Sequence, residues 1–330
     1  MKGISFDAIG RIIAAIALLV PHFAFAQTES DKYPGKQVRF ICPWPPGGAT
    51  DFVSRFFAQR MTDALGQQVF VDNRGGAAGI IGTEIGARAP ADGYTLTFAN
   101  LSVVAINPFL YSKLPYDPLR DFAPVIELAE GVILLLIHPS VPVKSLQELI
   151  DLAKTKPGSL NLGSPGSGTY AHLGGEMINS MAGIKLVHVP YKGSGAGLTA
   201  LIAGETQVYI EPVATSLQHV RAGRLRAIAV TSGRRTSLLP ELPTMIESGL
   251  PGYEVSSWYG IMVPAATPRA VVLRLNEVVN RILGQAEVKE RLAADAILTV
   301  GGTPEAFGAK MKLELARWGK VVKDTGAKAD

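Results

Sequence analysis

The sequence contains a single cysteine, Cys42, among 330 residues. An internal disulfide is therefore excluded, and because no reactive-thiol motif surrounds Cys42, we expect a small buried residue at the end of a strand. The chain also lacks the patterns G-x-S-x-G, G-x-x-x-x-G-K-[ST] and H-E-x-x-H, and any cysteine cluster. These absences argue against the familiar serine-hydrolase, phosphate-loop and zinc-protease sites. We predict neither a cofactor nor a bound metal.

Charge and long apolar segments are also scarce. Charged residues make up 18% of the chain, the formal net charge is +4, and the basic residues are scattered, with Arg234 and Arg235 as an adjacent pair. Nucleic-acid-binding surfaces carry a basic stripe with interleaved aromatic side chains, so we expect no nucleic-acid partner. After residue 20 no segment is long and apolar enough to span a bilayer, which takes ~20 residues.

The first 26 residues have the pattern of an export signal. Lys2 and Arg11 make the start positive, residues 12–20 form a short apolar core, and residues 24–26 (Ala-Phe-Ala) form a small-residue cleavage site. A buried N-terminal helix is the alternative, but it does not explain why the three regions occur in this order. The sequence predicts cleavage near Ala26 and an exported mature protein.

The mature chain, of roughly 300 residues, is too long for one ordinary core and predicts two lobes. Apolar strands alternate with helices of 3.6-residue periodicity, and the alternation restarts near residue 130. Such a pattern predicts an α/β protein with mostly parallel sheets flanked by helices. We assign residues 27–128 and 252–330 to one lobe and residues 129–251 to the other.

Two strand-to-helix loops share the pattern P-G-x-x-T, once as Pro46 to Thr50 and once as Pro165 to Thr169. In parallel sheets, ligands bind beyond the carboxyl ends of the strands. Glycines let the backbone approach a ligand, Thr or Asp caps the helix, and the helix start offers free N–H groups and a positive dipole end. One such loop from each lobe predicts a shared cleft for a small anion, although either loop alone is also ordinary turn chemistry.

Polar residues at other strand ends are further candidates for the same cleft. They are Asn73–Gly76, the Asn100–Ser102 turn, Tyr191–Gly193, and Glu211. A polar loop residue is more often solvated than functional. His172, just inside the helix after the second loop, is expected to make a structural hydrogen bond, and His188 to be a core residue of a strand, because no nucleophile motif accompanies them.

These stretches together resemble the substrate-binding receptors of tripartite tricarboxylate transporters, the Bug receptor family. The similarity covers essentially the whole mature chain in order, including YPGKQVRFICPWPPGGATD, VDNRGGAAGIIGTEIGARAPADGYTL, LNLGSPGSGTYAHLGGEM, VPYKGSGAGLTALIAGE and LPELPTMIESGLPGYEVSSWYGIMVPAATP. The resemblance implies a type II periplasmic binding fold, with a ligand cleft between two lobes. It also implies a monomeric receptor, not an enzyme, that captures a small carboxylate by hinge closure and delivers it to membrane permease subunits.

In this family the two glycine loops hold a ligand carboxylate, largely through backbone groups and waters. Carried over by position, the resemblance implies these ligand-binding residues: Trp44, Pro46, Gly47, Gly48, Ala49, Asp51, Asn73, Asn100, Ser102, Ser164, Gly166, Ser167, Gly168, Thr169, Tyr170 and Tyr191. Two other functions stay open. One is a periplasmic enzyme acting on a small acid, with His172 and Glu211 as an acid–base pair, and the other is a ligand sensor for a membrane signalling partner.

Overall fold

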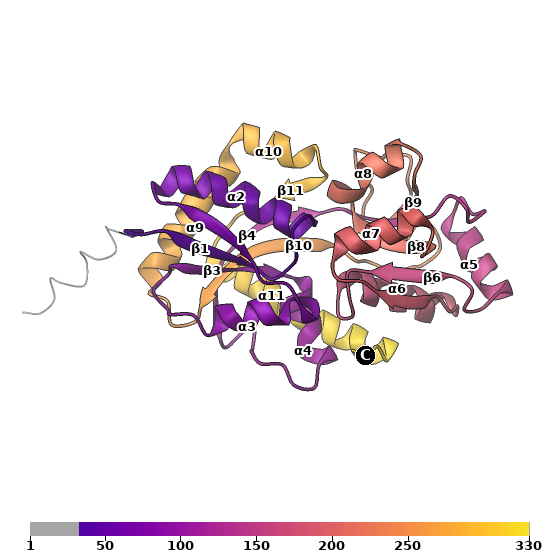
Figure 1. Cartoon of the computed structure of the whole chain (residues 1–330), viewed down its shortest axis with the longest axis horizontal. Coiled ribbons are helices and arrows are strands. Elements are labelled where there is room, and N and C mark those ends of the chain that lie inside the picture. Colours follow the sequence, from indigo (N-terminus) through magenta and orange to yellow (C-terminus); the bar gives the residue numbers. More distant parts are fainter. Residues whose placement is uncertain (1–32, 330) are drawn as a thin grey trace, which may run out of the picture. The chain divides into compact units, whose positions relative to one another are not determined.

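The computed structural model describes residues 33–329, whose strands form two sheets flanked by helices (Figure 1). The expected α/β class is thus confirmed. The predicted export signal, residues 1–26, lies outside the described residues. From Lys36 onwards the chain forms one compact unit, and the assignment of its residues to two lobes stays a prediction.

The first sheet has the strand order β11-β4-β10-β3-β1-β2. Its strands are β1 (Val38–Cys42), β2 (Val69–Asn73), β3 (Thr95–Asn100), β4 (Phe122–Gly131), β10 (Ser257–Pro264) and β11 (Ile297–Thr299). The helices that accompany it are α2 (Ala49–Leu65), η2 (Ala77–Gly79), α3 (Ile80–Ala87), η3 (Ser102–Ile106), α4 (Asn107–Leu110), α9 (Arg269–Gly284), α10 (Ala286–Ala293) and α11 (Pro304–Thr325). Cys42 ends β1 as a fully buried residue, as predicted.

The second sheet has the order β7-β6-β8-β5-β9. Its strands are β5 (Ile133–Ile137), β6 (Asn161–Ser164), β7 (Val187–Pro190), β8 (Val208–Pro212) and β9 (Arg226–Val230), and its helices are α5 (Leu146–Thr155), α6 (Tyr170–Ala182), α7 (Ser194–Ala203) and α8 (Val213–Arg221). A Cβ on Gly197 of α7 would meet Tyr209, and one on Gly174 of α6 would meet Ile210. Since successive strand residues point to opposite faces, α6 and α7 cover opposite faces of this sheet.

Most strands within each sheet run in one direction. The pairings make β1, β2, β3 and β4 parallel to one another, with β10 and β11 reversed. In the second sheet β6, β7, β8 and β9 share a direction and β5 is reversed. The reversed β5 and β10 are the strands on which the chain arrives from the other sheet. Each connection reaches its new sheet at the edge where the parallel strands end. The strand that follows therefore runs antiparallel to those strands.

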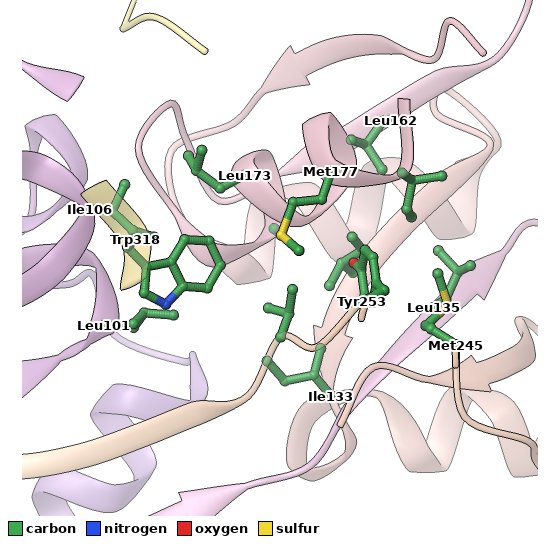
Figure 2. Close-up of a cluster of buried hydrophobic side chains, with 14 of the residues drawn as sticks. Leu101, Ile106, Ile133, Leu135, Leu162, Leu173, Met177, Met245, Tyr253 and Trp318 are labelled. Atoms are coloured by element: carbon green, nitrogen blue, oxygen red, sulfur yellow. The ribbon is translucent and has the colours of Figure 1, made fainter. Parts of the chain in front are cut away.

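One hydrophobic core includes side chains that accompany both sheets. Trp318 of α11 is 1% exposed, and α11 packs on both η3 and α6. In Figure 2, Leu101 and Ile106 lie on one side of Trp318, and Leu173 and Met177 of α6 lie on the other. The last helix of the chain therefore joins the two sheets through shared apolar contacts.

Candidate ligand-binding site

A cavity of about 80 Å³ lies between the carboxyl ends of the parallel strands of the two sheets. We call it the central cavity. At ~10–15 Å³ for each water-sized group it has space for a carboxylate and a few further atoms. Its lining comes from β1, β3, β6, β7, β8 and β10 or the residues that follow or precede them: Trp44, Pro45, Pro46, Gly48, Ala49, Thr50, Asn100, Leu101, Pro165, Thr169, Tyr170, Lys192, Gly193, Ser194, Gly195, Ala196, Pro212, Ser257 and Tyr259.

Two larger grooves share walls with the central cavity. The large groove, of about 1040 Å³, shares Gly48, Ser194 and Gly195 with it and runs along α2, α7, α8 and α10. The small groove, of about 600 Å³, shares Trp44 and Pro165 with it and reaches residues 75–78. A ligand held in the central cavity thus has room to extend in two directions.

Five of the described helices begin at the central cavity, because Leu101 before η3 and Pro212 before α8 also line it, and three of the five follow glycine-containing loops. Gly48 precedes α2, Thr169 precedes α6 and Gly193 precedes α7. The first N–H groups of a helix have no partner within it, and the helix dipole makes this end positive. Three helix starts around one small cavity make it a favourable place for an anion.

The first loop is held by Asp51, in the first turn of α2. Its Oδ1 accepts hydrogen bonds from Arg55 Nε at 3.0 Å and Asn73 Nδ2 at 2.9 Å, and its Oδ2 accepts from the Gly47 N–H at 3.1 Å. Burial opposes ionisation of Asp51, but the bonds from Arg55, Asn73 and Gly47 outweigh it and lower the pKa. Asn73 also donates to the Trp44 carbonyl at 3.0 Å. Asp51 and Asn73 therefore fix the loop that forms one wall of the cavity.

The two P-G-x-x-T loops start their helices at different points of the pattern. Thr169 is the N-cap of α6, and its Oγ1 accepts a hydrogen bond from the His172 N–H. In the first loop the N-cap is Gly48, which has no side chain for this bond, so Thr50 lies inside α2. The prediction that Thr or Asp caps each helix holds for Thr169 and is wrong for Thr50.

The second loop is held by a serine and two histidines. Ser164 Oγ lies 2.6 Å from His188 Nε2, and the His188 ring stacks on His172 with centroids 4.0 Å apart. The Gly168 N–H donates to His172 Nδ1 at 3.2 Å, which confirms the expected structural bond. Burial and the neighbouring His188 lower the pKa of His172 to about 3. His188 is partly exposed rather than a core residue, because β7 is the edge strand of its sheet.

Four buried polar atoms on residues that line these spaces have no hydrogen-bond partner among the described residues: Trp44 Nε1, Tyr259 Oη, Glu211 Oε2 and His219 Nδ1. Trp44 Nε1 is a donor, and Trp44 lines both the central cavity and the small groove. Glu211 Oε2 is an oxygen of a fully buried carboxyl group that borders the large groove. Buried polar atoms are normally paired, so each of these awaits a partner from outside the chain.

The predicted site residues fall into three groups. Those that line the central cavity are Trp44, Pro46, Gly48, Ala49, Asn100, Thr169 and Tyr170. Those that line a groove are Gly47 and Asp51 in the large groove, and Asn73, Gly166, Ser167 and Tyr191 in the small groove. The remaining three, Ser102, Ser164 and Gly168, line none of these spaces, and Gly168 packs against Asn107, Leu110 and Tyr111.

Sequence reasoning named Tyr191–Gly193 as a candidate but did not extend it to residues 194–196 in the first turn of α7, and it missed the β10 residues Ser257 and Tyr259, which line the same cavity. The α7 start had a readable signal, because Lys192-Gly193-Ser194-Gly195 follows a strand as the two other glycine loops do. Ser257 and Tyr259 had no such sequence signal. Their strand, β10, is distant in sequence and lies at the site because it pairs between β3 and β4. Within the described part of the chain there is no cluster of His, Cys, Asp and Glu suited to a metal ion, and no helix long and apolar enough to cross a membrane.

The arrangement can be compared with known proteins. The family model described as tripartite tricarboxylate transporter family receptor matches residues 53–327. The chain belongs to this receptor family. Protein BugT of Bordetella pertussis (strain Tohama I) is 36% identical to the receptor over 320 residues, which cover 96% of this chain and 98% of BugT.

Solved structures agree with this assignment. A protein of R. palustris solved with adipate is 36% identical, with a TM-score of 0.87 over 90% of this chain and 99% of that one. MatC of Rhodopseudomonas palustris, solved with bound malate, is 31% identical, with a TM-score of 0.84 over 88% of this chain and 100% of MatC. The receptor therefore has the fold of periplasmic solute-binding proteins, as the sequence predicts.

Proposed function

We propose that this receptor captures a small carboxylate in the periplasm and delivers it to the membrane permease subunits of a tripartite transporter, without transforming it. The ligand carboxylate lies in the central cavity, and the remainder of the ligand extends into one of the grooves. The residues of the two glycine loops that line these spaces make the contacts, together with the start of α7.

The observation that carries the proposal is the convergence of three helix starts on one small cavity. Each start presents unpaired N–H groups and a positive dipole end, and Trp44 Nε1 adds a buried donor without a partner. A carboxylate offers about four acceptor sites to these donors and gains from the positive field. The two similar proteins solved with adipate and malate support the same ligand class.

The geometry supports capture by closure around the ligand. The cavity is lined by residues that accompany both sheets, so a ligand in it contacts both at once. Such a ligand binds the closed arrangement better than an open one and shifts the population towards it. We propose that the chain bends in the two connections between the sheets, which are residue 132 between β4 and β5 and residues 231–256 between β9 and β10.

The test is a thermal-shift screen of mono-, di- and tricarboxylates that includes adipate and malate. The receptor is first unfolded and refolded to remove any ligand retained from expression. A true ligand at a hundredfold excess over its dissociation constant stabilises the protein by about 2.7 kcal/mol. The matched control is adipamide, which has the shape of adipate without its charge and is expected to give no shift. A flat response across the whole acid panel contradicts the proposal.

A further inference from the structure

Glu211 is a buried carboxyl group on the large groove, which adjoins the proposed anion site. It lies on β8, one residue before the strand ends, and none of it is exposed to solvent. Because Tyr209 and Glu211 are two positions apart, both point to the face of the sheet that α7 covers. The residues around Glu211 are Ser194 at the start of α7, Thr215 on α8 and three tyrosines, Tyr170, Tyr209 and Tyr259.

The Glu211 carboxyl group is only half satisfied. Its Oε1 accepts a hydrogen bond from the Thr215 hydroxyl at 2.6 Å, while Oε2 is buried without a partner of normal geometry among residues 33–329. The groups that favour its ionised form are two neutral hydroxyls, those of Thr215 and Ser194. A buried carboxylate without a cationic partner is costly. Burial accordingly raises the pKa of Glu211 to about 7.

The anion site and Glu211 share their neighbours. Ser194 lines both the central cavity and the large groove that Glu211 borders, and Tyr170 and Tyr259 line the central cavity. A carboxylate held at the start of α7 therefore lies beside the Glu211 carboxyl group. Two carboxylates in such proximity do not both stay ionised, because the repulsion of like charges raises the pKa of one of them.

We propose that Glu211 is a ligand-binding residue, which acts in its protonated form by donating a hydrogen bond from Oε2 to the ligand carboxylate, so that capture of the anion is coupled to uptake of one proton. This inference rests on the proposed carboxylate function. When Glu211 is ionised in the free receptor, the proton comes from solvent and stays on Glu211 while the ligand is bound. Release of the ligand then returns the proton.

The other titratable groups around Glu211 keep one charge state near neutral pH. Burial raises the pKa of Tyr170, Tyr209 and Tyr259, so all three stay neutral. Burial, together with Arg224, lowers the pKa of His219 on α8, which also stays neutral. Asp51 on α2 stays ionised and paired with Arg55. Lys192, just before α7, lines the central cavity and adds a positive charge. Glu211 is therefore the group that we expect to titrate in this range.

The experiment measures the dissociation constants of adipate and malate by calorimetry between pH 6 and pH 9. We expect constant affinity up to about pH 6.5 and then a loss that approaches about tenfold per pH unit, because binding requires the protonated form. At pH 8, repeats in buffers of different ionisation enthalpy should show uptake of close to one proton per ligand. Glu211→Gln, which carries a permanent donor, should bind within threefold of wild type at pH 6 and show no loss up to pH 9.

A second variant and a control keep the test decisive. Thr215→Val removes the hydrogen bond that favours ionised Glu211, so the loss of affinity should move to higher pH. Glu290→Gln, which replaces an exposed carboxylate on α10, should keep the wild-type profile.

Two results would overturn the inference and leave the receptor function standing. One is a wild-type affinity that does not change between pH 6 and pH 9, and the other is a Glu211→Gln variant whose affinity falls with pH as steeply as that of wild type. Proton release instead of uptake also overturns it. If no carboxylate binds at any pH, the proposed function falls and the inference with it.

Discussion

Gly48, at the start of α2, faces Ser194 at the start of α7 across the central cavity. Its φ of −93° and ψ of 173° suit any residue, and a Cβ there would lie 3.7 Å from the Ser194 Cβ. Gly48 is therefore needed for the space it leaves, and not for its backbone conformation. Gly168 differs, because its φ is +84° and a Cβ would meet Asn107 at 3.0 Å. A side chain at position 168 disturbs the fold, whereas one at position 48 narrows the cavity.

We expect Gly48→Val to weaken carboxylate binding at least tenfold, which is about 1.4 kcal/mol, because the valine side chain fills the approach to the helix starts. The loss of a favourable N-cap residue should lower stability by about 1 kcal/mol. Calorimetric titration and denaturant unfolding measure the two effects. Gly284→Val, at the exposed end of α9 where a Cβ meets nothing within 4 Å, is the matched control and should keep full affinity. Equal affinity in both variants would show that the cavity wall at Gly48 does not face the ligand.

Glu211 also predicts how the stability of the ligand-free receptor depends on pH. Its folded-state pKa of about 7 lies above its ordinary value of 4.5, so between these values the folded state holds more protons than the unfolded state. The free energy of unfolding therefore falls as pH rises through this range, by about 2 kcal/mol between pH 5 and pH 7.5. Urea unfolding at the two pH values should show this loss in wild type and a smaller one in Glu211→Gln. Identical pH slopes would contradict the folded-state pKa of Glu211.

At the scale of elements, the site depends on where each helix starts. The same five-residue pattern produces a glycine N-cap in α2 and a threonine N-cap in α6, because Asp51 binds back to Gly47 while Thr169 binds forward to the His172 N–H. The start of α7 has neither kind of side-chain hydrogen bond. Its N-cap is Gly193, whose φ is +99°. Local sequence thus predicted that helices start near these glycines, and the surrounding contacts decided at which residue.

Thr169, the N-cap of α6, can be tested against Thr303, which caps α11 with the same type of hydrogen bond. Thr169→Ala removes the cap bond to His172 and the 2.8 Å bond to the Gly166 carbonyl, so we expect a loss of about 1 kcal/mol of stability and weaker ligand binding. Thr303→Ala removes the equivalent cap of α11, in which Thr303 accepts from the Ala306 N–H, at a residue that lines none of the three spaces. It should lose similar stability and keep its affinity. Thermal unfolding and titration of both variants separate the two roles, and equal affinity in both would count against Thr169 as part of the site.

At the scale of the whole molecule, we expect the shared hydrophobic core to make the described unit unfold as one. Trp318 is buried among side chains of η3 and α6, and its Nε1 donates to Glu314 Oε2 at 3.0 Å. Closure and opening of the cavity therefore occur around a core that stays in contact.

We expect a single calorimetric unfolding transition for wild type. Trp318→Ala should cost about 3–5 kcal/mol and separate the transition into two, because the shared contacts are lost. Leu313→Ala, on the same helix but 68% exposed, is the control and should leave one transition near the wild-type temperature. Two transitions in wild type would contradict the coupling of the two sheets through α11.

The sequence by itself determined the α/β class, the two strand-helix sets and the two glycine loops, because each rests on local periodicity or turn chemistry. Only the tertiary structure decided that Ser257 and Tyr259 of β10 join the site and that the start of α7 completes it, since these contacts depend on how strands distant in sequence pair. It also decided that Ser102, Ser164 and Gly168 lie behind the cavity wall, and that Glu211 is buried with one oxygen unpaired. The burial of a residue and the electrostatic field at it are set by its neighbours in space. These neighbours cannot be read from the order of residues along the chain.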